Sequence, residues 1–284
     1  MCRHLAYAGP AISPARLLFE APHSLSRQSW APRDMRGGGT INADGFGVGW
    51  FPGPTRPGPT RPGPTRSGAI RYRRATPLWS DLTLPSLAAS IEVTGMLGAV
   101  RSATEGMPVV ETAAAPFGDG PWLFSHNGKI AGWPGSMAKL ASTLPATDLL
   151  TLEAPTDSAL LWALVRDRLR HATGPGTATG PGTATGPGTA TGPGTATGPA
   201  EAVMATVAEV EAAAPGSRLN LLLTDGTTIV ATTVGHSLAV RHDGGSVLVS
   251  SEPLDDDPEW QPVPDRHLLV ATASEITLTP LGEQ

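Results

Sequence analysis

Short apolar segments bounded by glycine or proline dominate both ends of the chain. Segments of this length and pattern are typical of β-strands. In the first half they cover residues 2–9, 45–51, 69–73, 95–101 and 121–128, and in the second half residues 218–226, 227–234, 237–242, 246–253 and 267–273. Asp225 and Gly226, between two of these segments, form a pair that favours a tight hairpin turn. The pattern therefore predicts two blocks of antiparallel strands.

Helical periodicity lies between the two strand blocks. In residues 156–171 the apolar side chains recur at the spacing of one buried helix face, at Leu160, Leu161, Leu164, Val165 and Leu169. Thr156 is a candidate N-cap for this helix. Residues 136–143 and 202–214 are two further predicted helices. Strands in two blocks with helices between them indicate an α+β fold, in which two packed sheets are flanked by helices.

Two low-complexity inserts interrupt this pattern. Residues 52–66 repeat the motif PGPTR three times, and residues 173–196 repeat the motif TGPGTA four times. Because proline removes backbone donors and glycine raises the entropy cost of ordering, neither insert can build a packed core. We therefore expect a single domain over residues 1–284, with the inserts at 52–66 and 173–199 forming disordered surface loops.

Composition narrows the class of protein. The apolar content of 40% is enough for a sizeable core, and a formal net charge of -5 leaves no basic stripe that could neutralise nucleic-acid phosphates. The chain also lacks an N-terminal secretory signal and an uninterrupted run of about 18 apolar residues. We therefore expect a soluble, cytoplasmic protein that binds neither nucleic acid nor membranes.

The single cysteine of the chain stands at position 2, directly after the initiator methionine. Removal of Met1 leaves Cys2 with a free α-amine, and such an amine has a reference pKa of about 7.7–8.0, close to the value of about 8.5 for a thiol. The amine can then accept the thiol proton and return it later, so one residue supplies both nucleophile and base. Position alone favours a small buried residue without chemistry, so the catalytic interpretation needs support from other residues.

Polar groups at the ends of predicted strands, and at the start of a helix, supply that support. Asn127 and Gly128 offer a side-chain amide and a backbone N–H, the kinds of donor that form an oxyanion hole, although such a pair alone is more often a turn. Arg101 can bind a carboxylate bidentately, and Asp157 can hold an ammonium group. Taken alone, Arg101 is more often a surface arginine, and Asp157 is more often a charge that stabilises a helix N-terminus. Together they outline a receptor for an α-amino acid that presents a glutamyl γ-carbonyl to Cys2.

These motifs, in this order, resemble those of the class II glutamine amidotransferases, which are N-terminal-nucleophile hydrolases. The segments that carry the resemblance are MCRHLAYAG, NADGFGVGW, RSAT, FSHNG and TDSALLWAL. The opening MCRHLAYAGP, the segment NADGFGVGW and the late SSEPLDDDPEW resemble more narrowly the γ-glutamyl amidohydrolases of ergothioneine biosynthesis. The resemblance runs from residue 2 to about residue 273, apart from the inserts, and implies a four-layer αββα sandwich of two antiparallel sheets.

For activity, the resemblance implies an enzyme that cleaves the γ-glutamyl amide of γ-glutamyl hercynylcysteine sulfoxide through a thioester on Cys2. Arg101, Asp157 and the Thr104 segment would bind the glutamyl group, beside the oxyanion donors named above. Two departures from the family pattern are visible. Glu105 follows Thr104 where many amidotransferases carry histidine, and no synthase domain follows, which argues against ammonia channelling within this chain.

Two alternative functions stay open, and so does the oligomeric state. The chain could be a glutaminase subunit that supplies ammonia to a separate synthase, or a non-catalytic module that binds γ-glutamyl compounds. The seven histidines form no cluster at ligand spacing, so we expect no metal and no cofactor. His4 is expected to be a buried, hydrogen-bonded histidine. Trp50 and Trp260 are candidate contacts for the cationic trimethylammonium of the leaving group, although core packing is the blander role of each.

Overall fold

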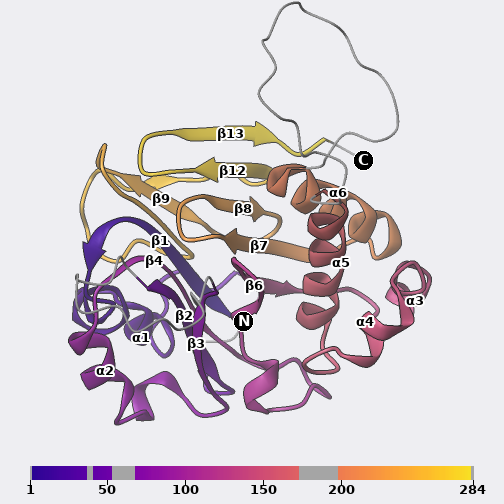
Figure 1. Ribbon diagram of the computed structural model, residues 1–284, viewed down its shortest axis with the longest axis horizontal. Coiled ribbons are helices and arrows are strands. Elements are labelled where there is room, and N and C mark those ends of the chain that lie inside the picture. Colours follow the sequence, from indigo (N-terminus) through magenta and orange to yellow (C-terminus); the bar gives the residue numbers. More distant parts are fainter. Residues whose placement is uncertain (1, 37–40, 53–67, 173–197, 283–284) are drawn as a thin grey trace, which may run out of the picture.

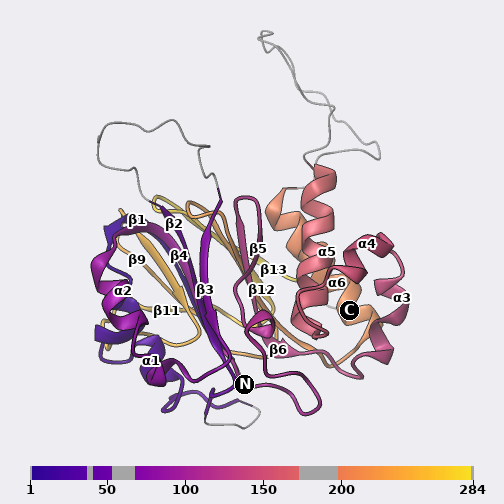
Figure 2. The ribbon, with the colours of Figure 1, turned by 60° about the horizontal axis from the view of Figure 1, so that its bottom comes forward.

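Two antiparallel sheets pack face to face, and helices cover their outer faces (Figure 1). The computed structural model describes residues 2–36, 41–52, 68–172 and 198–282. Figure 2 shows the layers in order, from α1 and α2 through the two sheets to α5 and α6. The predicted α+β fold, a four-layer αββα sandwich of two antiparallel sheets, is confirmed.

The first sheet has the strand order β11-β9-β10-β1-β4-β2-β3 in the described part of the chain. Its strands are β1 (Arg3–Ile12), β2 (Phe46–Pro52), β3 (Ile70–Arg74), β4 (Val93–Val100), β9 (Ala239–His242), β10 (Val247–Ser250) and β11 (Gln261–Pro262). β1 lies at the centre, where Leu5 pairs with Gly98 of β4 and with Ser250 of β10. Cys2 therefore stands at the beginning of a central strand.

The second sheet has the strand order β13-β12-β8-β7-β6-β5 over the same ranges. Its strands are β5 (Phe117–Asp119), β6 (Trp122–Lys129), β7 (Arg218–Thr224), β8 (Ile229–Thr233), β12 (His267–Ala271) and β13 (Ile276–Pro280). The register of β6 with β7 runs from Leu123 to Lys129, whereas its register with β5 ends at Phe124. The second half of β6 therefore has a strand on one side only.

The helices are divided between the two outer faces. The first sheet is covered by the π-turn η1 (Arg16–Glu20), α1 (Leu25–Gln28), η2 (Leu78–Ser80) and α2 (Leu84–Ser90). The second sheet is covered by η4 (Gly135–Met137), α3 (Ala138–Ala141), α4 (Ala146–Leu150), α5 (Asp157–Ala172) and α6 (Pro199–Ala213), and η3 (Glu111–Ala113) precedes β5.

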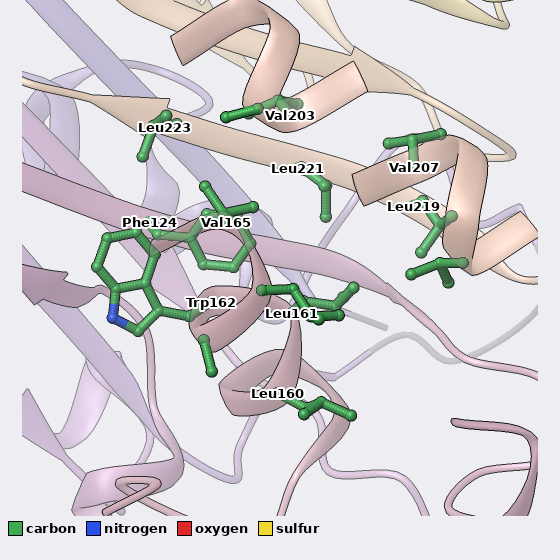
Figure 3. Close-up of a cluster of buried hydrophobic side chains, with 14 of the residues drawn as sticks. Phe124, Leu160, Leu161, Trp162, Val165, Val203, Val207, Leu219, Leu221 and Leu223 are labelled. Atoms are coloured by element: carbon green, nitrogen blue, oxygen red, sulfur yellow. The ribbon is translucent and has the colours of Figure 1, made fainter. Parts of the chain in front are cut away.

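Alternation along β1 separates two parts of the core. Leu5 and Tyr7 belong to the apolar cluster under α1 and α2, whereas Ala6 and Ala8 belong to the cluster between the sheets. On the far side, Phe124 of β6 stacks on Trp162 of α5 with ring centroids 5.5 Å apart (Figure 3). Burying side chains of this size contributes roughly 1.5–3 kcal/mol each, so these clusters hold the four layers together.

Most of the predicted elements are confirmed, with shifted ends. Each of the ten predicted strand segments overlaps an observed strand, and the helices predicted at 156–171 and 202–214 are α5 and α6. The helix predicted at 136–143 is the short α3 preceded by η4. Thr156 acts as the expected cap, since its Oγ1 accepts the Ala159 N–H at 3.2 Å. Asp225 and Gly226 form the expected hairpin turn, in which the Asp225 carboxylate accepts the Thr228 N–H at 2.8 Å.

Several elements were not predicted, namely β5, β11, β13, α1, α2 and α4. The two inserts lie largely outside the described residues, so their expected disorder stays a prediction. At their margins, Pro52 is the last residue of β2 and Pro199 is the first residue of α6. Within the described ranges, no helix is long and apolar enough to cross a membrane.

Candidate active site

Cys2 and Arg101 lie at the same edge of the first sheet. The register pairs Arg3 of β1 with Val100 of β4, so the residues that flank this pair, Cys2 and Arg101, line one small pocket. The Cys2 Sγ lies 3.9 Å from the Ser102 carbonyl oxygen. Arg101 is 9% exposed, and its guanidinium donates to the Pro108 carbonyl at 2.8 Å. The structure therefore brings together the expected nucleophile and the expected carboxylate-binding arginine.

Residues of the second sheet and of α5 complete this pocket. Ser125 and His126 of β6 and Ser158 of α5 line it opposite Cys2. His126 Nδ1 lies 3.0 Å from Ser158 Oγ, and its Nε2 lies 2.9 Å from the Arg218 carbonyl. The pocket is thus formed where the ends of both sheets meet the first turn of α5.

Asn127 reaches across from the second sheet to the first. Its Nδ2 lies 3.4 Å from Ser251 Oγ, which in turn accepts the His4 N–H at 3.0 Å. Its Oδ1 is buried without a hydrogen-bond partner among the described residues. The side-chain amide therefore lies close to the strand that carries Cys2, and one of its polar atoms is unsatisfied.

Gly128 lies near the end of its strand, as expected, although β6 continues by one residue to Lys129 and pairs with β7 there. Its own pairing partner is Leu219. A Cβ atom at this position would lie 1.9 Å from the Arg218 carbonyl oxygen, so only glycine fits. Since the pairing of β6 with β5 ends at Phe124, the following residues of β6 have no strand partner on that side among the described residues.

Asp157 is the first residue of α5 and is 4% exposed. Its Oδ1 accepts the Ser158 N–H at 2.7 Å, and its Oδ2 accepts the Ile130 N–H at 3.2 Å. The carboxylate therefore borders the pocket of Cys2 through Ser158 without lining it. It joins the start of α5 to the loop that follows β6.

Thr104 lies in a neighbouring pocket rather than in the one that Cys2 lines. That second pocket, of about 480 Å³, is lined by Thr104, Glu105, Lys129, Ile130 and Trp133 among others. Its link to the first pocket is the hydrogen bond between Ile130 and Asp157. Of the site residues expected from the sequence, Cys2 and Arg101 line one pocket and Thr104 lines its neighbour, whereas Asn127, Gly128 and Asp157 line neither.

His4 is buried and hydrogen-bonded, as expected, with Nδ1 3.2 Å from Ser125 Oγ. Burial, aided by His126, His236 and Arg3 nearby, lowers the pKa of His4 to about 3. Burial lowers the pKa of His236 to about 3 as well, aided by Arg218. Both imidazoles are therefore neutral at pH 7 and place no positive charge near Cys2.

The two tryptophans considered for the leaving group lie elsewhere. Trp50 belongs to the apolar cluster on the outer face of the first sheet. Trp260 donates to Asp255 at 2.7 Å and packs against Arg241. Neither lines a pocket with Cys2, so core packing is the role that the structure supports for Trp50. In the described part of the chain no group of three or more His, Cys, Asp or Glu side chains could hold a metal ion.

Sequence reasoning missed a buried ion-pair network next to Cys2. Arg3 and Glu252 form a salt bridge of 2.8 Å, and His23 lies 2.6 Å from the same carboxylate. Both residues stand in motifs that the sequence analysis singled out, because Arg3 follows Cys2 directly and Glu252 belongs to the segment SSEP. They are about 250 positions apart, so the sequence alone did not indicate that they contact each other.

Comparison with known proteins identifies the family to which this chain belongs. No protein-family model matches the chain. It is 36% identical over 281 residues to the γ-glutamyl-hercynylcysteine sulfoxide hydrolase of Mycolicibacterium smegmatis, covering 99% of this chain and 100% of that protein. It is 35% identical to the protein of the same name from Mycobacterium tuberculosis, covering 99% and 97%. A probable glutamine amidotransferase of Saccharomyces cerevisiae is 26% identical over 325 residues, covering 100% of this chain and 85% of that protein.

Among solved structures, the fold is similar to that of a glutamine aminotransferase class-II domain protein of Silicibacter pomeroyi. The TM-score is 0.62 at 20% identity, covering 99% of this chain and 100% of that chain. Since the similarity to the mycobacterial proteins extends over nearly the whole of both chains, it includes the N-terminal cysteine strand and both sheets. The chain therefore belongs to the family of the γ-glutamyl-hercynylcysteine sulfoxide hydrolases and has the fold of the class II glutamine amidotransferases.

Proposed function

We propose that this enzyme hydrolyses the γ-glutamyl amide bond of γ-glutamyl hercynylcysteine sulfoxide, releasing glutamate and hercynylcysteine sulfoxide. The observation that carries the proposal is the full-length similarity to two hydrolases that are named for this substrate. The geometry supports it, because Cys2 and Arg101 line one pocket at the end of the central strand β1. We place the protein in the cytoplasm, where this small-molecule substrate would be its partner.

The residues suggest an order of events. After removal of Met1, which lies outside the described residues, the Cys2 amine takes the thiol proton and the sulfur attacks the γ-carbonyl. Asn127 and Gly128 donate hydrogen bonds to the oxyanion that develops. The leaving amine takes the proton back, which leaves a γ-glutamyl thioester on Cys2. Water activated by the same amine then releases glutamate and restores the thiol.

Arg101 and Asp157 are proposed to bind the two charged groups of the glutamyl head. The Arg101 guanidinium now donates to one backbone carbonyl, so it can exchange that contact for a bidentate pair with the substrate carboxylate. The Asp157 carboxylate accepts two backbone N–H groups and keeps lone pairs for an ammonium. Thr104 lines the adjacent pocket, where it would border the same head group. No step of this scheme calls for a metal or a cofactor.

A second candidate is glutaminase activity, in which glutamine is cleaved and ammonia passes to a separate synthase. The observation that favours it is the 26% identity to a probable glutamine amidotransferase. The chemistry at Cys2 would be the same in both cases, and only the leaving group would differ. A non-catalytic γ-glutamyl-binding module is the alternative of a different class, and glutamate release by the wild-type protein that is lost in Cys2→Ala would exclude it.

Glutamate release from the purified enzyme tests the choice. We expect kcat/KM for γ-glutamyl hercynylcysteine sulfoxide to exceed that for glutamine by about a hundredfold or more, the scale of roughly 3 kcal/mol of lost pocket contacts. The Cys2→Ala variant should bind the conjugate without releasing glutamate. Equal or faster turnover of glutamine would favour the glutaminase. Undiminished glutamate release by Cys2→Ala would exclude the Cys2 mechanism.

A further inference from the structure

Buried charged side chains lie directly behind the residue that carries the nucleophile. Arg3, His23 and Glu252 are 2%, 3% and 3% exposed, and the chemical steps proposed above do not use them. Burying charges is costly unless hydrogen bonds satisfy them. The hydrogen bonds of these three side chains show how the cost of burial is offset and which backbone groups they hold.

Glu252 is the centre of the network. Its Oε1 accepts from Arg3 Nε at 2.8 Å and from the Asp34 N–H at 3.2 Å. Its Oε2 accepts from His23 Nε2 at 2.6 Å and from the Arg33 N–H at 2.8 Å. Burial alone would raise the pKa of the Glu252 carboxyl, but these hydrogen bonds and the charge of Arg3 outweigh burial and lower it. Glu252 is thus a carboxylate with both oxygens engaged.

Arg3 links the Glu252 carboxylate to the backbone of Cys2. With Nε fixed by Glu252, its Nη1 donates to the Cys2 carbonyl at 3.0 Å and its Nη2 donates to the Asp34 carbonyl. The strand ladder of β1 begins one residue later, where Arg3 pairs with Val100. The guanidinium therefore gives the Cys2 peptide a hydrogen bond that lies outside the ladder. It also ties that peptide to residues 33–34.

We propose that Arg3 and Glu252 are positioning residues of the Cys2 nucleophile. Glu252 fixes the guanidinium, the guanidinium fixes the Cys2 carbonyl, and the carbonyl fixes the orientation of the amine and thiol that share its Cα. Proton transfer from the thiol to the amine requires the two groups to lie within hydrogen-bond distance of each other. A Cys2 carbonyl that is free to rotate therefore lowers the rate of sulfur attack. The effect on turnover rests on the proposed function, whereas the reactivity of the thiol can be measured without substrate.

Glu252 and Arg3 act on Cys2 through one chain of hydrogen bonds, because Glu252 holds the guanidinium and the guanidinium holds the Cys2 carbonyl. Arg101 and His126 line the pocket of Cys2, and His23 contacts the Glu252 carboxylate. Removing either member of the chain releases the carbonyl, so positioning predicts a lower kcat and slower thiol alkylation in both single variants, with KM near the wild-type value. A general loss of packing would raise KM as well.

The test compares Arg3→Met, Glu252→Gln and the double variant with a control ion pair. Glu211→Gln is the matched control, because Glu211 pairs with Arg266 at 2.7 Å between α6 and the start of β12. Cys2 is the single cysteine, so iodoacetamide alkylation reports on it alone. The alkylation rate is measured against pH, and kcat and KM are measured for the γ-glutamyl conjugate.

In Arg3→Met we expect kcat to fall about tenfold or more, the scale of one lost charge-assisted hydrogen bond, with KM within about threefold of wild type. The alkylation rate should fall across the pH range in both single variants, because either change releases the Cys2 carbonyl. Removing one partner of a buried pair can unfold a protein, so the double variant serves as the stable comparison. It should show a reduced alkylation rate and a reduced kcat, and Glu211→Gln should change neither quantity.

Three results would overturn the proposal. They are a kcat within twofold of wild type in the double variant, a wild-type alkylation rate in both single variants, and an equal loss of kcat in Glu211→Gln. If the wild-type enzyme released glutamate from neither substrate, the proposed function would fail. The alkylation measurements would still decide whether Arg3 and Glu252 position Cys2.

Discussion

The Asn127→Ala variant tests the proposed oxyanion hole against a control that lies directly opposite it. The register of the second sheet pairs Asn127 of β6 with Asn220 of β7, and their side chains are 1% and 0% exposed. Asn127 makes one long hydrogen bond, of 3.4 Å, and its Oδ1 is unsatisfied. Asn220 makes four hydrogen bonds, of 2.9 to 3.3 Å, to the backbone of residues 234–237.

These contacts predict opposite outcomes for the two variants. Asn127→Ala loses one weak bond and an unsatisfied oxygen, so the free energy of unfolding should change by less than about 1 kcal/mol. Its kcat should fall about a hundred- to a thousandfold, the effect of removing one oxyanion donor. Asn220→Ala leaves the N–H groups of Val234 and His236 without this partner, which should cost about 2–4 kcal/mol of stability with little change in kcat.

Thermal unfolding and steady-state kinetics at saturating substrate measure both quantities for each variant. A destabilisation of about 1 kcal/mol should lower Tm by only about 2–4 °C in a protein of this size, so the two variants are readily separated. If Asn127→Ala kept kcat within threefold of wild type, Asn127 would have no place in the mechanism. If Asn220→Ala lost as much kcat as Asn127→Ala, the loss would reflect strand packing rather than oxyanion binding.

Three further predictions concern the chain end, the buried histidine and the second insert. An N-terminal tag that is never removed should reduce glutamate release to the level of Cys2→Ala, and wild-type activity of the tagged enzyme would refute the amine as base. His4 has a pKa of about 3 in the folded state and about 6.5 in the unfolded state, so the unfolded state binds more protons between these values. The free energy of unfolding should therefore decrease as the pH falls below 6.5. In urea titrations a His4→Gln variant should show a shallower decrease, and an unchanged slope would contradict the assignment. Because α5 and α6 pack against each other, replacing residues 173–197 with a short Gly/Ser linker should leave Tm and kcat close to wild type, and a large loss of either would show that the insert contributes contacts.

The sequence predicted the fold where local pattern and tertiary pairing agree. The apolar segment that became β1 and the periodic one that became α5 were found because burial alone imposes their patterns. β13 was missed because most of its side chains are exposed, so its pairing with β12 leaves little trace in the sequence. α1 has only four residues and shows no periodicity. Short and exposed elements depend on contacts that a single segment does not reveal.

The same reasoning explains the outcome at the site. Cys2 and Arg101 were proposed from their residue types, and they line one pocket because β1 and β4 pair in the first sheet. The Asn-Gly pair was expected at the end of a strand, and β6 ends one residue later, at Lys129. The turn that such a pair favours in isolation does not form, because both residues pair with β7. Thr104 was expected beside the glutamyl group and lies in the neighbouring pocket. Loop positions of this kind depend on backbone paths that motifs do not specify.

The position proposed for the nucleophile satisfies two requirements that usually conflict. An α-amine that acts as base must be at the chain end, and chain ends are ordinarily the least ordered part of a fold. Here the first described residues enter the centre of a sheet, because β1 lies between β4 and β10. Even-numbered residues of β1 face the second sheet, since His4 contacts Ser125 of β6, and Cys2 lines a pocket with the same Ser125. A central strand can thus give the proposed nucleophile the fixed geometry that catalysis needs, and the proposed role of the Arg3–Glu252 pair is to extend that order by the one residue that the ladder does not reach.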